Sequence, residues 1–168
     1  MILHGSTEFE EHPFELEADL EDAIQEVKAK LFGTSRIYLE IKRKIGKKGG
    51  KQNIPDAYIL GLSSAKAPKL FVVENELSRH DHLKHIAVQI LEFSLAFEIN
   101  PQRVKEVIRE ALKKDAAAEE FAAEYAKKNQ FENVDYLLDR IVHRKEAFTA
   151  LVIIDELKPE LENIFREE

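Results

Sequence analysis

The chain has 168 residues, a mass of 19.4 kDa and 44% hydrophobic residues, which is the size and composition of one globular domain. It has no cysteine, which excludes disulfides and thiolate metal sites, and no apolar run approaches the roughly 20 residues that cross a bilayer. A net charge of −7 argues against a protein that coats nucleic acid through its whole surface. We therefore expect a single cytoplasmic domain over residues 1–168, with no signal peptide and no membrane segment.

The first half of the chain predicts a helix followed by three strands. Apolar residues recur at helical spacing over residues 14–31, and Gly33 follows as a stop signal. Residues 37–42, 54–60 and 70–77 are short apolar runs with strand propensity, and a glycine-containing turn joins the first two. These runs predict a three-stranded meander.

The second half predicts helices and one more strand. Helices are expected from Ser78 to about Glu98 and over about 101–112, 115–128 and 134–143, with a last one from Pro159. Residues 148–154 form a β-branched run short enough to be a buried strand. We therefore place the core at about 10–100 plus 148–154, and a helical extension of surface-type helices at about 101–145. The extension either covers the sheet or forms a dimer face.

Three acids stand on the second and third predicted strands. Asp56 lies in the second strand, and in the third Glu74 and Glu76 share a face with Val72, because alternate strand residues point the same way. Carboxylates that leave a buried strand side by side repel each other unless a cation, a proton or a basic side chain offsets them. Such a set can hold one or two hard cations such as Mg²⁺. The alternative is that these acids are solvated at a sheet edge.

A basic segment separates the first two strands. Its six basic residues, with no acid among them, are Lys42, Arg43, Lys44, Lys47, Lys48 and Lys51. They are candidates for contacts with nucleic-acid phosphates, and the alternative is a solvated hairpin tip. Histidines at 80, 82 and 85 raise a zinc site as another alternative, but their spacing does not specify a three-ligand geometry. A helix cap, an ion pair with the nearby glutamates or a phosphate contact is expected of them instead.

The order helix, long hairpin, strand and helix, with the residues it carries, resembles the PD-(D/E)XK nuclease superfamily. Pro55-Asp56 matches its PD motif, and Glu74-Asn75-Glu76 stands where the family has (D/E)-X-K. Gln89 to Phe93, which faces the core by helical spacing, is similar to the Gln-x-x-x-Tyr motif of the RecB-like and archaeal DNA-nuclease branches, with Phe for Tyr. Glu17 resembles the family's leading helical glutamate, with Glu21 as the second choice. The resemblance covers about residues 10–100.

The resemblance implies an α/β fold with a restriction-endonuclease-like core, in which helices flank a central mixed sheet of about four strands. It implies metal-dependent hydrolysis of DNA phosphodiester bonds by Glu17, Asp56, Glu74, Glu76 and Gln89. Within this set, Asp56, Glu74 and Glu76 would bind Mg²⁺ or Mn²⁺. DNA is the expected partner, with a homodimer or a larger protein assembly as a further expectation.

The chain departs from the family at Glu76, where a lysine is expected. A Glu-x-Glu version is known in some restriction enzymes of the superfamily. Acid in place of lysine raises the demand for cations, because lysine otherwise offsets the metal-binding acids. Lys42, on the preceding strand, could replace this lysine in space, or it could be a solvated strand residue. The alternative function is that of a catalytically inactive relative that binds nucleic acid or a protein partner.

Overall fold

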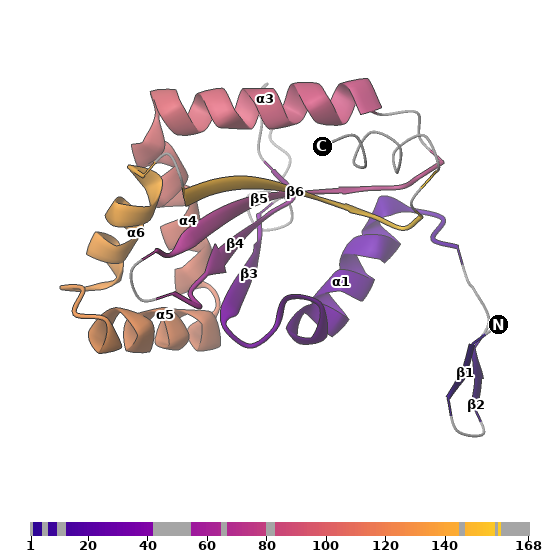
Figure 1. The fold of residues 1–168 in the computed structure, drawn as a ribbon, viewed down its shortest axis with the longest axis horizontal. Coiled ribbons are helices and arrows are strands. Elements are labelled where there is room, and N and C mark those ends of the chain that lie inside the picture. Colours follow the sequence, from indigo (N-terminus) through magenta and orange to yellow (C-terminus); the bar gives the residue numbers. More distant parts are fainter. Residues whose placement is uncertain are drawn as a thin grey trace.

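The computed structural model describes residues 2–4, 7–9, 13–41, 55–64, 67–79, 83–144, 147–156 and 158. Within these ranges a four-stranded mixed sheet and five helices form an α/β fold (Figure 1). A separate antiparallel ribbon pairs β1 (Ile2–His4) with β2 (Thr7–Phe9). The fold class predicted from the sequence is thus confirmed. Among the described helices, none is long and apolar enough to cross a membrane.

The sheet has the strand order β3-β4-β5-β6. β3 (Arg36–Glu40), β4 (Ala57–Gly61) and β5 (Lys69–Glu76) form the expected antiparallel meander. β6 (Phe148–Ile154) adds a fourth strand parallel to β5, with Glu74 opposite Val152. The expected strand over 148–154 is therefore present, but its side chains are half-buried or exposed rather than buried, because β6 lies at the edge of the described sheet.

One face of the sheet is covered by α1 (Glu17–Phe32). The helix starts where the Asp19 carboxylate accepts a hydrogen bond from the Leu16 N–H at 3.1 Å. It ends at Gly33, whose φ of 78° favours a residue without a Cβ. The buried side of α1 packs on strand side chains that alternation directs toward it. This small apolar cluster consists of Leu20, Ile24, Tyr38, Ala57, Ile59, Val73 and Leu77.

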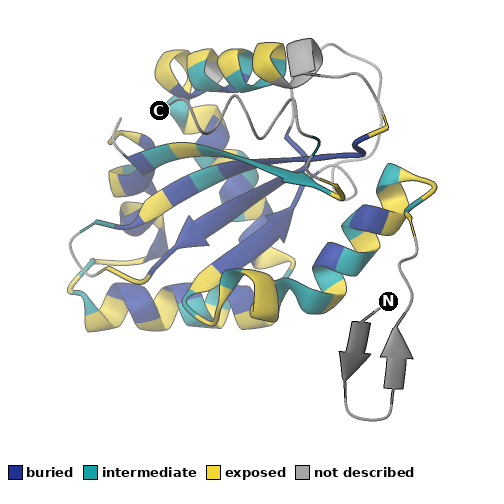
Figure 2. Ribbon diagram, turned by 45° about the vertical axis from the view of Figure 1, so that its right-hand side comes forward, coloured by how far each residue is buried: buried dark blue, intermediate teal, exposed yellow. Residues whose placement is uncertain are grey.

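The opposite face of the sheet is covered by α3 (Leu83–Ile99), α4 (Pro101–Lys113), α5 (Ala116–Lys128) and α6 (Val134–Val142). The last three helices start at polar caps: Asn100, Asp115 and Asn133 accept backbone hydrogen bonds at 3.2, 3.0 and 2.8 Å. Ile108 and Leu138 on these helices are fully buried in the larger core. The helical extension therefore covers the sheet through the buried faces of amphipathic helices whose outer faces are exposed; Figure 2 shows the strands beneath it as largely buried.

Candidate functional site

Asp56 and Glu74 are neighbours at one end of β4 and β5. The register pairs Ala57 with Val73, so one residue further along it sets Asp56 opposite Glu74. On the other side of this segment, the Ile41 N–H donates to the Asp56 carbonyl at 2.9 Å, which continues the β3–β4 pairing by one residue. Two of the acids predicted from the sequence are therefore cross-strand neighbours.

Glu74 and Glu76 point to the face covered by α3 to α6. Val72 belongs to the larger core on that face, and Val73 belongs to the α1 cluster. Because strand residues alternate between faces, the even-numbered residues that follow Val72 share its face. The expectation that Val72, Glu74 and Glu76 lie on one face is confirmed.

These three acids are buried. Asp56, Glu74 and Glu76 are 2%, 5% and 8% exposed. Burial of a carboxylate is costly unless hydrogen bonds, a proton or a cation offset it. For Asp56 part of the offset comes from the backbone of β5, since Oδ2 accepts the Asn75 N–H at 2.8 Å. That bond also fixes the orientation of the Asp56 carboxylate against β5.

Tyr58, which belongs to no sequence motif named above, lies on the same face as Glu74. Burial raises the pKa of its hydroxyl above the ordinary value, and the negative charge of Glu74 raises this pKa further. The Glu74 carboxylate is therefore near enough to Tyr58 for its charge to act on the hydroxyl. A sequence signal exists: Tyr58 follows Asp56 by two residues, which is the spacing of one strand face.

Gln89 lies on the sheet-facing side of α3. It precedes the buried Phe93 and Phe97 by one and two turns, and the ring centroids of Phe97 and Phe148 are 5.1 Å apart. Phe148 pairs with Leu70 at the start of β5, so the Phe97–Phe148 contact places Phe97 near Leu70. From there, Gln89 is eight residues back along α3, or about 12 Å, and Glu74 is four residues along β5, or about 13 Å. Since α3 runs back from the end of β5, Gln89 stands about level with Glu74. Its Oε1 is buried and has no hydrogen-bond partner among the described residues.

Asp155 is a further acid at this end of the sheet. β5 and β6 are parallel, so their final residues, Glu76 and Ile154, stand opposite each other. Asp155 follows directly, and its Oδ1 accepts the Ser78 N–H at 2.7 Å. The carboxylate joins the ends of two strands and remains exposed. The sequence could have indicated Asp155 as a strand-end acid, because it is the first polar residue after the apolar run that ends at Ile154.

The donor set suits a cation that keeps part of its water shell. Among the described residues, no group of three or more His, Asp or Glu side chains is arranged to hold a metal ion. Asp56 and Glu74 instead offer two neighbouring carboxylates at strand positions. Mg²⁺ is usually bound through one or two carboxylates, waters and substrate phosphates, and Mn²⁺ favours the same oxygen donors. These two residues therefore fit Mg²⁺ or Mn²⁺ by their chemistry.

Glu17 lies on the other side of the sheet from Glu74 and Glu76. It occupies the first turn of α1, one turn before Leu20, which packs in the cluster that contains Val73. The helix therefore covers the face that Glu74 and Glu76 do not share. The charges of Asp56 and of Glu21, the second choice on α1, both act on the Tyr38 hydroxyl, so Asp56 lies near the α1 face as well as beside β5.

A second polar group lies beneath α1. Gln25 donates to Glu40 Oε2 at 2.8 Å and accepts from Lys28 Nζ at 3.2 Å. Nearby, the Asn75 amide donates to the Tyr38 hydroxyl at 3.5 Å. Burial raises the pKa of Tyr38 to about 12; the Asn75 hydrogen bond opposes this rise, and the charges of Glu40, Asp56 and Glu21 add to it. These side chains join α1 to the sheet.

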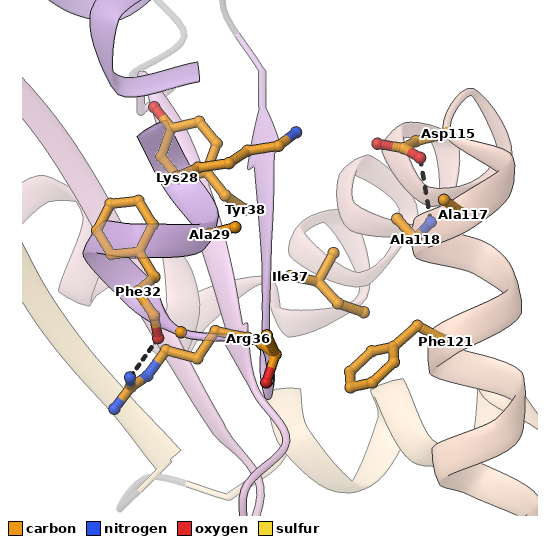
Figure 3. Close-up of a pocket in the computed structure, with 12 residues that line it drawn as sticks. Lys28, Ala29, Phe32, Arg36, Ile37, Tyr38, Asp115, Ala117, Ala118 and Phe121 are labelled. Atoms are coloured by element: carbon orange, nitrogen blue, oxygen red, sulfur yellow. Dashed lines mark hydrogen bonds between the residues drawn. The ribbon is translucent and has the colours of Figure 1, made fainter. Parts of the chain in front are cut away.

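A cavity of about 310 Å³ opens along the outer edge of β3, between α1 and the start of α5. Figure 3 shows Phe32 and Phe121 on opposite sides of it, with Lys28 extending toward the α5 side. Its rim carries both signs of charge, from Lys28 and Arg36 on one side and Asp115 on the other. Arg36 donates to the Phe32 carbonyl at 2.5 Å, and Asp115 caps α5. None of the predicted site residues lines this cavity.

Several sequence predictions fall outside the described residues. They concern the basic residues Lys42, Arg43, Lys44, Lys47, Lys48 and Lys51, and the histidines His80 and His82. The side chain of His85 is also outside the described set. Phosphate contacts by these residues, and the replacement of the motif lysine by Lys42, stay predictions.

The fold and the buried acids define an α/β protein with a four-stranded mixed sheet and a carboxylate group at one end of its central strands. No protein-family model matches the chain, and neither a curated protein nor a solved structure matches it.

Proposed function

We propose that this protein is a metal-dependent nuclease of the PD-(D/E)XK type that hydrolyses phosphodiester bonds in DNA. The observation that carries the proposal is that Asp56, directly before β4, and Glu74, next to its hydrogen-bond donor Asn75 on β5, are both buried at the same end of two antiparallel strands. The element order supports it, because α1, β3, β4, β5 and α3 follow one another as helix, hairpin, strand and helix. The parallel β6 completes a sheet of the expected size.

The proposed roles follow from the position of each residue. Asp56 and Glu74 would hold Mg²⁺ or Mn²⁺, which lowers the pKa of a bound water and offsets charge on the phosphate. Asp56 is already oriented by the Asn75 N–H. Gln89 would direct its amide toward the site or the DNA backbone, since its buried Oε1 stands about level with Glu74. Glu76 would orient the attacking water at the position where the superfamily has lysine.

The proposal assigns no metal contact to Glu17. In the superfamily resemblance this residue contacts the site, but here it belongs to the helix over the opposite face of the sheet. The basic residues between 42 and 51 would bind DNA phosphates, which makes the affinity for DNA fall as salt rises.

The test of this proposal is DNA cleavage. Purified protein is incubated with labelled single-stranded, duplex and branched DNA in the presence of Mg²⁺, of Mn²⁺ or of a chelator. We expect cleavage that requires metal and is lost in Glu74→Ala and Asp56→Ala. Glu124→Ala is the matched control, because Glu124 is an exposed acid on α5. Equal cleavage by wild type and Glu74→Ala would identify a contaminating nuclease and overturn the assignment.

A second candidate is a catalytically inactive relative that binds nucleic acid or a protein partner. It is favoured by Glu76 at the lysine position. Calorimetry with Mn²⁺ separates the two candidates. Binding heat that disappears in Glu74→Ala supports the nuclease, whereas no heat at millimolar metal and an unchanged melting temperature support the inactive relative.

A further inference from the structure

The outer side of α3 carries an exposed apolar stripe. Its members are Val88, Leu91, Leu95 and Ile99, which are 51%, 59%, 46% and 79% exposed. Their spacing of three, four and four residues places them on one side of the helix. The buried Phe93 and Phe97 face the opposite way, into the core. α3 is therefore apolar toward solvent as well as toward the sheet, unlike an ordinary surface helix; Figure 2 shows its largely exposed outer side.

Such a stripe marks an interaction surface. Scattered apolar residues are normal on protein surfaces, but a contiguous row on one helix is typical of a helix that packs against another. The remaining large apolar residues that are exposed, Leu16, Leu31 and Tyr136, lie in other parts of the described fold.

We propose that two copies of this chain associate through this stripe, with their α3 helices antiparallel. The spacing supports a second copy as the partner, because the stripe is nearly symmetric about the midpoint between Leu91 and Leu95. A two-fold axis at that midpoint sets Leu91 beside Leu95 of the second copy, and Val88 beside Ile99 of the second copy. Each apolar residue then meets an apolar residue, which is the self-complementarity that a two-fold interface requires.

The size of the stripe sets the expected strength. From Val88 to Ile99 it covers 11 residue steps, or about 16 Å of helix. One helix face of this length is smaller than a standard protein interface. We therefore expect a dimer with micromolar affinity, whose formation depends on concentration.

The first test measures mass against concentration by sedimentation or light scattering of the full chain. We expect a monomer–dimer equilibrium that Leu91→Glu and Leu95→Glu each weaken at least tenfold. Leu31→Glu is the matched control, since Leu31 is 55% exposed on α1. Far-UV circular dichroism checks that each variant is folded. A wild-type chain that stays monomeric at every concentration would overturn the proposal and leave the stripe to a different partner.

The second test determines the orientation and uses the absence of cysteine from the chain. In the antiparallel pair, position 88 lies beside position 99 of the second copy and far from position 88. Oxidation of mixed Val88→Cys and Ile99→Cys proteins should therefore give a disulfide-linked dimer, while neither variant alone should do so. Rapid linkage of Val88→Cys to itself would indicate a parallel pair and contradict the proposed arrangement.

Discussion

The two faces of the sheet hold their buried polar groups differently. On the α1 face, polar side chains bond one another across helix and strand, as Gln25 does with Glu40 at 2.8 Å. On the opposite face the core is apolar over most of its extent, and Glu74 and Glu76 gather at one end of β5. Hydrogen bonds between helix and strand hold a layer in place, whereas acids gathered in one buried place are typical of a functional site. Asp56 stands between the two groups, because its carboxylate accepts the Asn75 N–H and its charge raises the pKa of Tyr38 beneath α1.

The same contrast applies to packing. The larger core joins the sheet to four helices, but the α1 cluster joins it to one. A side chain deep in the larger core is surrounded by elements that hold each other apart, so a cavity left there cannot collapse easily.

The largest expected effect is on the free energy of unfolding, for Leu138→Ala. Leu138 on α6 is fully buried in the larger core, and its truncation should cost about 3–5 kcal/mol. Leu20→Ala on α1 should cost less, about 2–3 kcal/mol, because its cluster is smaller and lies under a single helix. Urea unfolding followed by circular dichroism measures both values.

The exposed Leu31 provides the control for this pair. Leu31→Ala should change the free energy of unfolding by less than about 0.5 kcal/mol. If Leu20→Ala cost as much as Leu138→Ala, the two faces would contribute equally to stability, and the contrast in packing would be lost.

The fold follows from sequence patterns that act locally. The run at 148–154 predicts a strand because β-branched residues favour extended backbone, and the structure pairs it with β5. The caps Asn100 and Asp115 are where the sequence predicts them. The covering of the sheet by residues 101–142 could not be predicted, because it depends on which helix face meets which strand. Periodicity gives each face but not its partner.

The candidate site was predictable only in part, for a related reason. Strand alternation is enough to place Glu74 and Glu76 together. The pairing of Asp56 with Glu74 depends on the β4–β5 register, which the loop between the strands does not reveal. The side of the sheet that α1 covers is equally hidden from the sequence, so the position of Glu17 relative to the other acids required the structure.

A smaller change in the free energy of unfolding is expected for substitutions of Asp56, which test the candidate site. Asp56→Ala removes the acceptor of the buried Asn75 N–H, and we expect a loss of about 1–3 kcal/mol in the free energy of unfolding. Asp56→Asn keeps a side-chain oxygen at the same place and should lose clearly less. Urea unfolding without metal measures both variants. An equal loss in the two would mean that the charge of Asp56, and not its hydrogen bond, supports the fold.

The last expected effect is negligible at neutral pH and develops only at alkaline pH, from Tyr38 on the α1 face. Burial raises the pKa of Tyr38 to about 12, whereas the unfolded chain has the ordinary value of about 10. The native protein then holds the hydroxyl proton where the unfolded chain has lost it. The resulting stability is complete below about pH 10 and is lost as the pH rises to about 12.

Tyr38→Phe should therefore flatten the fall in unfolding free energy over this pH interval, with little change at neutral pH. Urea unfolding at a series of alkaline pH values measures the slope, and tyrosinate absorbance follows the titration directly. Tyr136→Phe on α6 is the control, because Tyr136 is 45% exposed and lacks the polar surroundings beneath α1. If the wild type and Tyr38→Phe lost stability with the same slope, the alkaline transition would belong to the other face, where Tyr58 lies beside Glu74.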